Sequence, residues 1–184
     1  MRAVIMKILT ISGSLRSASS NTAVLQALER VAPSSVRVTQ YAGLGSLPHF
    51  NPDLDGDHLP EHAAELREEV AASDALVISS PEYAHGVPGS LKNALDWLVG
   101  SLDFAGKPVA LINTAARAIH AQASLRETLQ TMAARIIDEA SITLALPTPS
   151  PDAGTIAADP GYATALRGVI GALIPAIESV RDDA

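Results

Sequence analysis

The sequence contains no cysteine among its 184 residues. It therefore has no disulfide, no thiolate metal site, no iron–sulfur cluster and no cysteine nucleophile. Aromatic residues make up only 3% of the chain. The apolar N-terminal stretch is interrupted by Lys7 and has no small-residue cleavage site after it, so we predict neither an export signal nor a membrane span. We expect a cytoplasmic protein that does not associate with membranes.

Positive charge is also scarce, because 13 Lys and Arg oppose 20 Asp and Glu for a formal net charge of −7. Such an acidic chain is not expected to bind nucleic acid through bulk charge. The apolar fraction of 47% is enough for a sizeable core. The length predicts one domain over residues 1–184. Because Met6 could itself start the chain, we interpret residues 1–5 as a dispensable extension.

Short β-branched runs alternate with longer segments of helical period. The predicted strands are Val4–Ile11, Val36–Tyr41, Ala75–Ser80, Pro108–Asn113 and Ile142–Leu146. The predicted helices are Asn21–Val31, Pro60–Ala72, Leu91–Val99, Ala121–Ile137 and Ala163–Val180, the last kinked at Pro175. The stretches 43–59 and 147–160 are expected to be surface loops.

This alternation predicts an α/β fold, a doubly wound five-stranded parallel sheet with helices on both faces. Ligands of such sheets bind at the carboxyl ends of the strands. The loops after the strands are therefore the candidate binding segments.

The loop after the first strand, ISGSLRSASSNT, gathers six hydroxyl side chains and Arg16 at a strand-to-helix turn. A helix N-terminus, small hydroxyls and a guanidinium together favour an anion such as phosphate. Neither the P-loop pattern nor G-x-G-x-x-G is present. A hydroxyl-rich helix cap without a ligand is the alternative, but six hydroxyls exceed what capping needs.

The loop after the third strand reads SSPEYAHGVPGSLKNALDW, and its prolines and glycines fix an irregular conformation. Together with GSLRSASSN, this motif resembles the NADPH-dependent FMN reductases of the flavodoxin-like fold. That family includes flavin, quinone, azo and chromate reductases. The resemblance is dense from Ser12 to Trp97 and looser to about Arg126.

The resemblance implies an FMN-binding site formed by three loops. The phosphate would be bound by Ser14, Arg16, Ser20, Asn21 and Thr22, and the isoalloxazine ring by Pro81, Glu82, Tyr83, Ala84, Gly86, Thr114 and Ala115. The family usually has Asn at position 84 and Ser at position 86, and a glycine-rich loop where this chain has NTAARAIHA. Contacts through the backbone would survive these differences, and Arg117 or His120 would reshape the substrate pocket.

The implied activity is that of an oxidoreductase. NADPH or NADH would pass hydride through FMN to a small-molecule electron acceptor by a ping-pong mechanism, with no catalytic side chain. Quinones, flavins, azo compounds and metal oxyanions are the implied acceptors, and a homodimer or homotetramer the implied assembly, with the helix around Trp97 as the candidate contact. The alternatives are a flavodoxin-type electron carrier and a phosphate-binding module without flavin.

Three other patterns are weaker, and we predict no metal site. The pattern H-x-x-E-H from His58 to His62 would need both histidines on one helix face, but Pro60 puts His58 ahead of the helix. The aspartates around Gly56 lack the spacing of a calcium loop. Glu82, His85 and Ser90 lack the nucleophile elbow of a hydrolase.

Overall fold

The computed structural model describes residues 5–56 and 58–182. Within these ranges six strands form one parallel sheet that is five strands wide. The strands are β1 (Met6–Ser12), β2 (Val36–Gln40), β3 (Ala75–Ser79), β4 (Pro108–Asn113), β5 (Arg135–Ile136) and β6 (Ile142–Thr143). The order is β2-β1-β3-β4-β5, and β6 pairs with β4 just beyond β5. Residues 1–4 of the expected extension lie outside the described residues. The predicted flavodoxin-like parallel sheet is confirmed.

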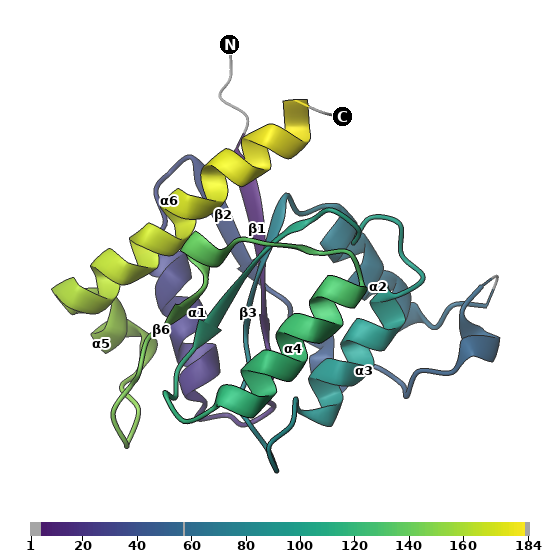
Figure 1. The fold of residues 1–184 in the computed structure, drawn as a ribbon, viewed down its shortest axis with the longest axis horizontal. Coiled ribbons are helices and arrows are strands. Elements are labelled where there is room, and N and C mark those ends of the chain that lie inside the picture. The colour runs from purple at the N-terminus through teal and green to yellow at the C-terminus, as the bar shows by residue number, and fades with distance from the viewer. Residues whose placement is uncertain (1–4, 57, 183–184) are drawn as a thin grey trace.

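Helices cover both faces of this sheet (Figure 1). They are α1 (Ser20–Val31), α2 (Glu61–Ala71), α3 (Gly89–Leu98), α4 (Ile119–Thr131), α5 (Ala153–Ala158) and α6 (Pro160–Asp182). Alternate side chains of β1 point into opposite layers: Ile8 packs with α1, α5 and α6, whereas Leu9 and Ile11 pack with α2, α3 and α4. The near-continuous apolar strands of the sequence follow from this burial on both faces.

The helix predicted over Ala121–Ile137 is six residues too long at its C-terminal end. In the structure α4 ends at Thr131, and Ala133 takes a left-handed conformation with φ 59°. The backbone N–H groups of Ala133 and Ala134 then bond to the carbonyls of Gln130 and Leu129, closing a Schellman motif. Alanine occupies this position in place of the usual glycine, so no residue type in the sequence signals the end of the helix.

The segment 147–160 is not entirely a loop, because α5 and the first residue of α6 lie within it. Asp152 caps α5 by accepting a hydrogen bond of 2.8 Å from the Thr155 backbone N–H. Pro175 does not end α6, which continues to Asp182. Within the described ranges α6 alone has the length and apolar composition of a membrane span, but its Leu166–Ile177 stripe is part of the core.

Trp97 lies in the core of the chain itself. Its side chain is fully buried, its indole Nε1 donates to the Pro48 carbonyl at 2.8 Å, and its ring meets Phe50 edge-on at 5.0 Å. Its side chain therefore cannot itself contact another subunit, whereas the expectation that the helix around it forms such a contact stays a prediction. This tryptophan instead fixes the 48–50 segment against α3.

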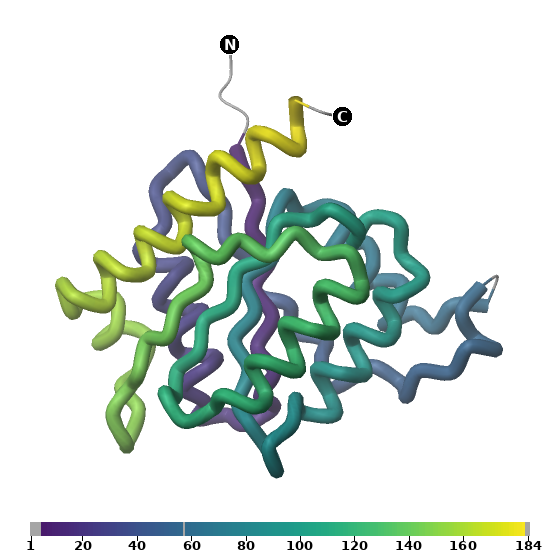
Figure 2. The backbone as a smooth tube through the Cα atoms, viewed as in Figure 1, coloured from purple at the N-terminus to yellow at the C-terminus, as the bar shows by residue number. Residues whose placement is uncertain are grey.

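The loops after β1, β3 and β4 gather at one end of the sheet, away from the two termini (Figure 2). The loops after β1 and β3 approach so closely that a Cβ on Gly13 would lie 2.8 Å from the Ser80 hydroxyl. Glycine is required there because no side chain fits between the two loops. This close approach brings the two predicted motifs to one place.

Candidate functional site

A buried hydrogen-bond network joins the start of α1 to the ends of β3 and β4. Asn21 is 4% exposed, and its Oδ1 accepts from the Ser79 hydroxyl at 2.8 Å and the Thr114 hydroxyl at 3.3 Å. Thr114 also contacts the Ser20 hydroxyl at 3.1 Å. The network therefore fixes the first turn of α1 relative to the loops that follow β3 and β4.

The loop after β1 folds on its own hydroxyl groups. The Ser12 hydroxyl accepts from the Ser14 backbone N–H and contacts the Thr22 hydroxyl at 2.9 Å, and the Ser14 hydroxyl accepts from the Arg16 backbone N–H. Ser19 is the N-cap of α1, accepting from the Thr22 N–H. Part of the hydroxyl cluster therefore caps the helix and shapes the turn, as expected for a helix cap without a ligand. Arg16 takes no part in this through its side chain and is exposed.

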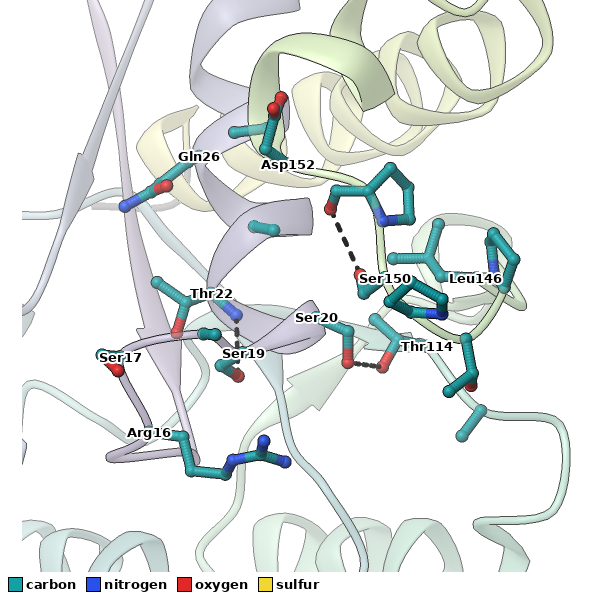
Figure 3. A pocket seen from close by; sticks show the side chains of 18 residues that line it. Arg16, Ser17, Ser19, Ser20, Thr22, Gln26, Thr114, Leu146, Ser150 and Asp152 are labelled. Carbon is teal, nitrogen blue, oxygen red and sulfur yellow. Dashed lines mark hydrogen bonds between the residues drawn. The ribbon is translucent and has the colours of Figure 1, made fainter.

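Two cavities open on either side of this junction and share Ser20, Thr114 and Ala115. The larger, about 620 Å³, lies between the start of α1 and the segment 146–153. In Figure 3 the Arg16 side chain extends beneath Ser19 and Ser20 at its lower edge. The smaller, about 320 Å³, lies between the loops after β3 and β4 and is lined by Ser80, Pro81, Glu82, Arg117 and Ala118 among others.

Charge is unevenly distributed around the larger cavity. Arg16 supplies a guanidinium at one edge, and no ion pair within the described ranges involves it. Asp152 lies on the opposite wall, where its hydrogen bond from the Thr155 N–H lowers the pKa of the carboxyl and keeps it ionised. An anion is therefore favoured next to Arg16 and α1 and disfavoured near Asp152.

The loop after β3 forms a tight two-residue turn. Tyr83 and Gly86 exchange backbone hydrogen bonds of 3.1 and 2.9 Å, and both central residues are left-handed, Ala84 at φ 49° and His85 at φ 60°. This pattern is a type I′ turn, which normally contains Asn and Gly. The turn therefore stores backbone strain directly after Glu82, which lines the smaller cavity.

The predicted site residues fall into two groups. Arg16, Ser20, Asn21, Thr22, Pro81, Glu82, Thr114 and Ala115 line one or both cavities, whereas Ser14, Tyr83, Ala84 and Gly86 line neither. Ser14 is buried under the β1 loop, and Tyr83 is half exposed on the turn. The Asn21 Oδ1 and the Thr114 hydroxyl are hydrogen-bonded to each other, so these groups mainly position the loops that would bind a ligand.

Sequence reasoning missed the wall formed by Pro147–Ala153, which faces α1 across the larger cavity. The signal was available, because this segment follows the last strand and so emerges at the same end of the sheet as the other loops. The alternation of proline with polar residues in PTPSPD favoured a surface loop instead.

The donor set fits a flavin mononucleotide. A phosphate monoester needs a cation, hydroxyls and free backbone N–H groups, and all three are found where α1 begins next to Arg16. A planar heterocycle needs a cavity bordered by backbone groups, and the smaller cavity lies between two strand ends whose loops offer such groups. The two cavities adjoin at Ser20, Thr114 and Ala115, which line both.

Comparison with known proteins gives a consistent result. The family model for NADPH-dependent FMN reductase matches residues 6–146. The NAD(P)H-dependent FMN reductase of Pseudomonas aeruginosa is 38% identical over 128 residues, covering 67% of this chain and 69% of that protein. The quinone reductase of Escherichia coli K12 is 37% identical over 117 residues, covering 62% of each chain.

Among solved structures, FerB from Paracoccus denitrificans, described as a flavoenzyme NAD(P)H:(acceptor) oxidoreductase, is similar over nearly the whole chain. The TM-score is 0.78 at 28% identity, and the match covers 95% of this chain and 98% of FerB. The similarity therefore extends past the family model, through α5 and α6.

Proposed function

The chain belongs to the NADPH-dependent FMN reductase family, and we propose that it passes hydride from NADPH or NADH through FMN to quinones, flavins, azo compounds or metal oxyanions. The observation that carries this proposal is the junction of Arg16, the start of α1 and the ends of β3 and β4 between two adjoining cavities. Ser20 and Thr114 line both the cavity proposed for the phosphate and the cavity proposed for the ring, and their hydroxyls contact each other.

The phosphate end of FMN would lie against the first turn of α1. Arg16 would supply donors with a fixed positive charge, and the hydroxyls of Ser20 and Thr22 further donors to the phosphate oxygens. Ser14 is buried outside the cavity and would act by holding the Arg16 backbone N–H. Asn21 would act through its bonds to Ser79 and Thr114, which hold that turn in position. The opposing Asp152 supports this orientation, because its ionised carboxylate would repel a phosphate at the far wall.

The ring end would lie between the loops after β3 and β4. Pro81, Glu82, Tyr83, Ala84 and Gly86 would border it on one side and Thr114 and Ala115 on the other, mainly through backbone groups. The Glu82 carboxylate is already used, because its Oε2 accepts from the Ala121 backbone N–H at 2.9 Å. A contact from Glu82 to the ring would therefore come from its backbone.

FMN, when bound, supplies the redox chemistry of the reaction, the exchange of two electrons between a nicotinamide and an acceptor. The residues of this chain bind and orient the reacting molecules, and we assign no side chain as acid or base. The rim residues Ala84, Ala115 and Ala116 are small and exposed. They would leave one open face for the nicotinamide and the acceptor in turn, which favours ping-pong kinetics.

Two alternatives make different demands on the same loops. A flavodoxin-type carrier shields its ring with bulky aromatic side chains. Between residues 81 and 120, all of which the structure describes, Trp97 and Phe104 are buried, and Tyr83 is the one exposed Tyr, Trp or Phe. A phosphate-binding module would not need the smaller cavity. Both alternatives are therefore less well supported than the reductase.

We further propose a cytoplasmic, single-domain protein that assembles as a homodimer or homotetramer. The exposed Val99 and Leu102, at 65% and 93%, lie just after α3 and are apolar side chains that an assembly could cover. They would replace the buried Trp97 as the centre of the contact. A sedimentation mass at micromolar concentration tests this point, and a fully active 19 kDa species would contradict it.

A steady-state assay tests the proposed reaction. The FMN-loaded protein is given NADPH at several fixed concentrations while a quinone, free flavin, an azo dye or chromate is varied. We expect parallel double-reciprocal lines and turnover with more than one acceptor class. Intersecting lines, or a preference for one acceptor of about 10⁴ or more, would contradict the open-face account.

A further inference from the structure

The rim between the loops after β3 and β4 is locally basic on an acidic protein. Arg117 lines the smaller cavity together with Glu82, and His85 and His120, which stack on each other, come from the two loops that border it. The Glu82 carboxylate accepts from the Ala121 backbone N–H and so is committed to the N-terminus of α4. Its charge compensates the helix dipole, which leaves the charge of Arg117 available.

Arg117 is exposed at the mouth of the smaller cavity. Its guanidinium forms no ion pair or hydrogen bond with another described residue. A guanidinium offers a planar set of donors that matches a carboxylate, a phenolate or an oxyanion. It is therefore positioned to contact the polar edge of a molecule entering that cavity.

The His85 and His120 rings stack with centroids 4.4 Å apart and an interplanar angle of 18°. Because the rings are nearly parallel, the lone pairs of their nitrogens do not converge on one point, so this geometry does not suit chelation of a metal ion by both. Ring N–H groups instead serve as donors to an acceptor at the ring edges. The pair links the strained turn after β3 to the start of α4, next to Arg117.

On this basis, and resting on the proposed reductase function, we propose that Arg117 with the His85–His120 pair determines acceptor specificity by favouring planar acceptors that carry a negative charge, such as ionised hydroxyquinones. An uncharged quinone would use the same cavity without the charge-assisted contact. The FMN phosphate would not occupy Arg117, because Arg16 and the start of α1 would bind it on the other side of Ser20 and Thr114.

The test is equilibrium binding to the oxidised, FMN-loaded protein without reductant. Two naphthoquinones of similar size serve as probes, 2-hydroxy-1,4-naphthoquinone, which is ionised at neutral pH, and uncharged 2-methyl-1,4-naphthoquinone. Calorimetry gives Kd for both with the wild type, Arg117→Gln, Arg117→Lys and His120→Gln. His85→Asn removes the stack while keeping a residue that tolerates the left-handed turn, and Arg167→Gln removes an exposed charge on α6 outside both cavities.

We expect Arg117→Gln to weaken the hydroxyquinone about fivefold at low salt, the scale of one partly exposed charge contact, while leaving the methyl compound unchanged. His120→Gln and His85→Asn should each reduce the same preference by about twofold. Arg117→Lys should retain most of it, and Arg167→Gln should match the wild type.

The proposal is overturned if Arg117→Gln weakens both quinones alike, or if the preference is unchanged. It is also overturned if the variants instead shift the ratio of NADPH to NADH affinity, because the anion at Arg117 would then be the dinucleotide phosphate. Bleaching of the flavin by NADPH in each variant reports the reductase function separately. A variant that bleaches normally but keeps the preference contradicts this inference alone.

Discussion

Glu82 caps a helix to which it does not belong: its Oε2 accepts a 2.9 Å hydrogen bond from the backbone N–H of Ala121, in the first turn of α4. Ala118, at the N-cap position, has no side chain that can do this. The carboxylate therefore ties the loop after β3 to the start of α4. The two borders of the smaller cavity are held together by this bond and by the His85–His120 stack.

We expect Glu82→Ala to lower the free energy of unfolding of the FMN-free protein by about 0.5–2 kcal/mol, the usual effect of losing a helix cap. Urea denaturation monitored by circular dichroism measures it, with a lower midpoint and an unchanged slope. Glu127→Ala is the matched control, because Glu127 is exposed on the same helix without an ion pair among the described residues. Equal effects of the two substitutions would argue against the cap.

Strain at Ala84 gives an effect of opposite sign. Because φ is 49° there, Ala84→Gly should raise the free energy of unfolding by about 0.5–1 kcal/mol despite the greater entropy of glycine in the unfolded chain. Ala123→Gly, at an exposed position inside α4, should lower it by about 1 kcal/mol. Denaturation curves of both variants check the pair, and a destabilised Ala84→Gly protein would show that the turn is not strained.

Tyr41 is buried, and its hydroxyl has no hydrogen-bond partner among the described residues. Burial, followed by the negative charges of Glu69 and Glu65, raises the pKa of this phenol from 10.0 to about 12. The unfolded chain then loses its proton first as the pH rises, so the contribution of Tyr41 to stability is present below pH 10 and is lost between about pH 10 and 12.

Tyr41→Phe should therefore make stability less dependent on pH across that range, and at pH 8 it should leave the free energy of unfolding unchanged or raise it by up to about 1 kcal/mol. Denaturation at pH 8 and pH 11 measures both quantities. Tyr162→Phe is the comparison for loss of a phenol elsewhere. A marked loss of stability at pH 8 in Tyr41→Phe would mean that the hydroxyl has a partner after all.

Arg16 should contribute most to FMN affinity, because it is the cation at the start of α1. A charge-assisted contact of this kind contributes about 1.5–3 kcal/mol, so Arg16→Ala should raise the Kd for FMN about tenfold or more. Quenching of FMN fluorescence at low salt measures it. Arg37→Ala, on the exposed side of β2, should leave the Kd unchanged. An unaltered Kd in Arg16→Ala would remove this residue from the phosphate site.

The parts of the fold that the sequence predicted are those with strong local signals. Continuous apolar runs such as Ala75–Ser79 indicate strands buried on both faces, and the bounds of β3, β4 and α1 agree to within a residue or so. The end of α4 was missed because Ala133 adopts a left-handed conformation that its sequence does not signal. α5 was missed because it is short and follows a proline-rich stretch.

The site was predictable in composition but not in geometry. The hydroxyl-rich loop and the PEY motif indicated which loops meet, and Arg16, Ser20, Pro81 and Thr114 line the cavities there. The commitment of Glu82 to α4 and the stacking of His85 on His120 could not be predicted, because each contact joins loops far apart in the sequence.

Anaerobic titration of the FMN-loaded protein with NADPH, followed by flavin absorbance, tests the reductase assignment most directly. We expect fast bleaching at about one equivalent of NADPH per FMN, and recovery of the oxidised spectrum when a quinone is added. The Arg16→Ala protein, loaded with excess FMN, should still bleach, because the proposed role of Arg16 is to bind the phosphate and not the ring. A flavin that stays oxidised under excess NADPH and NADH would contradict the account and favour an electron carrier.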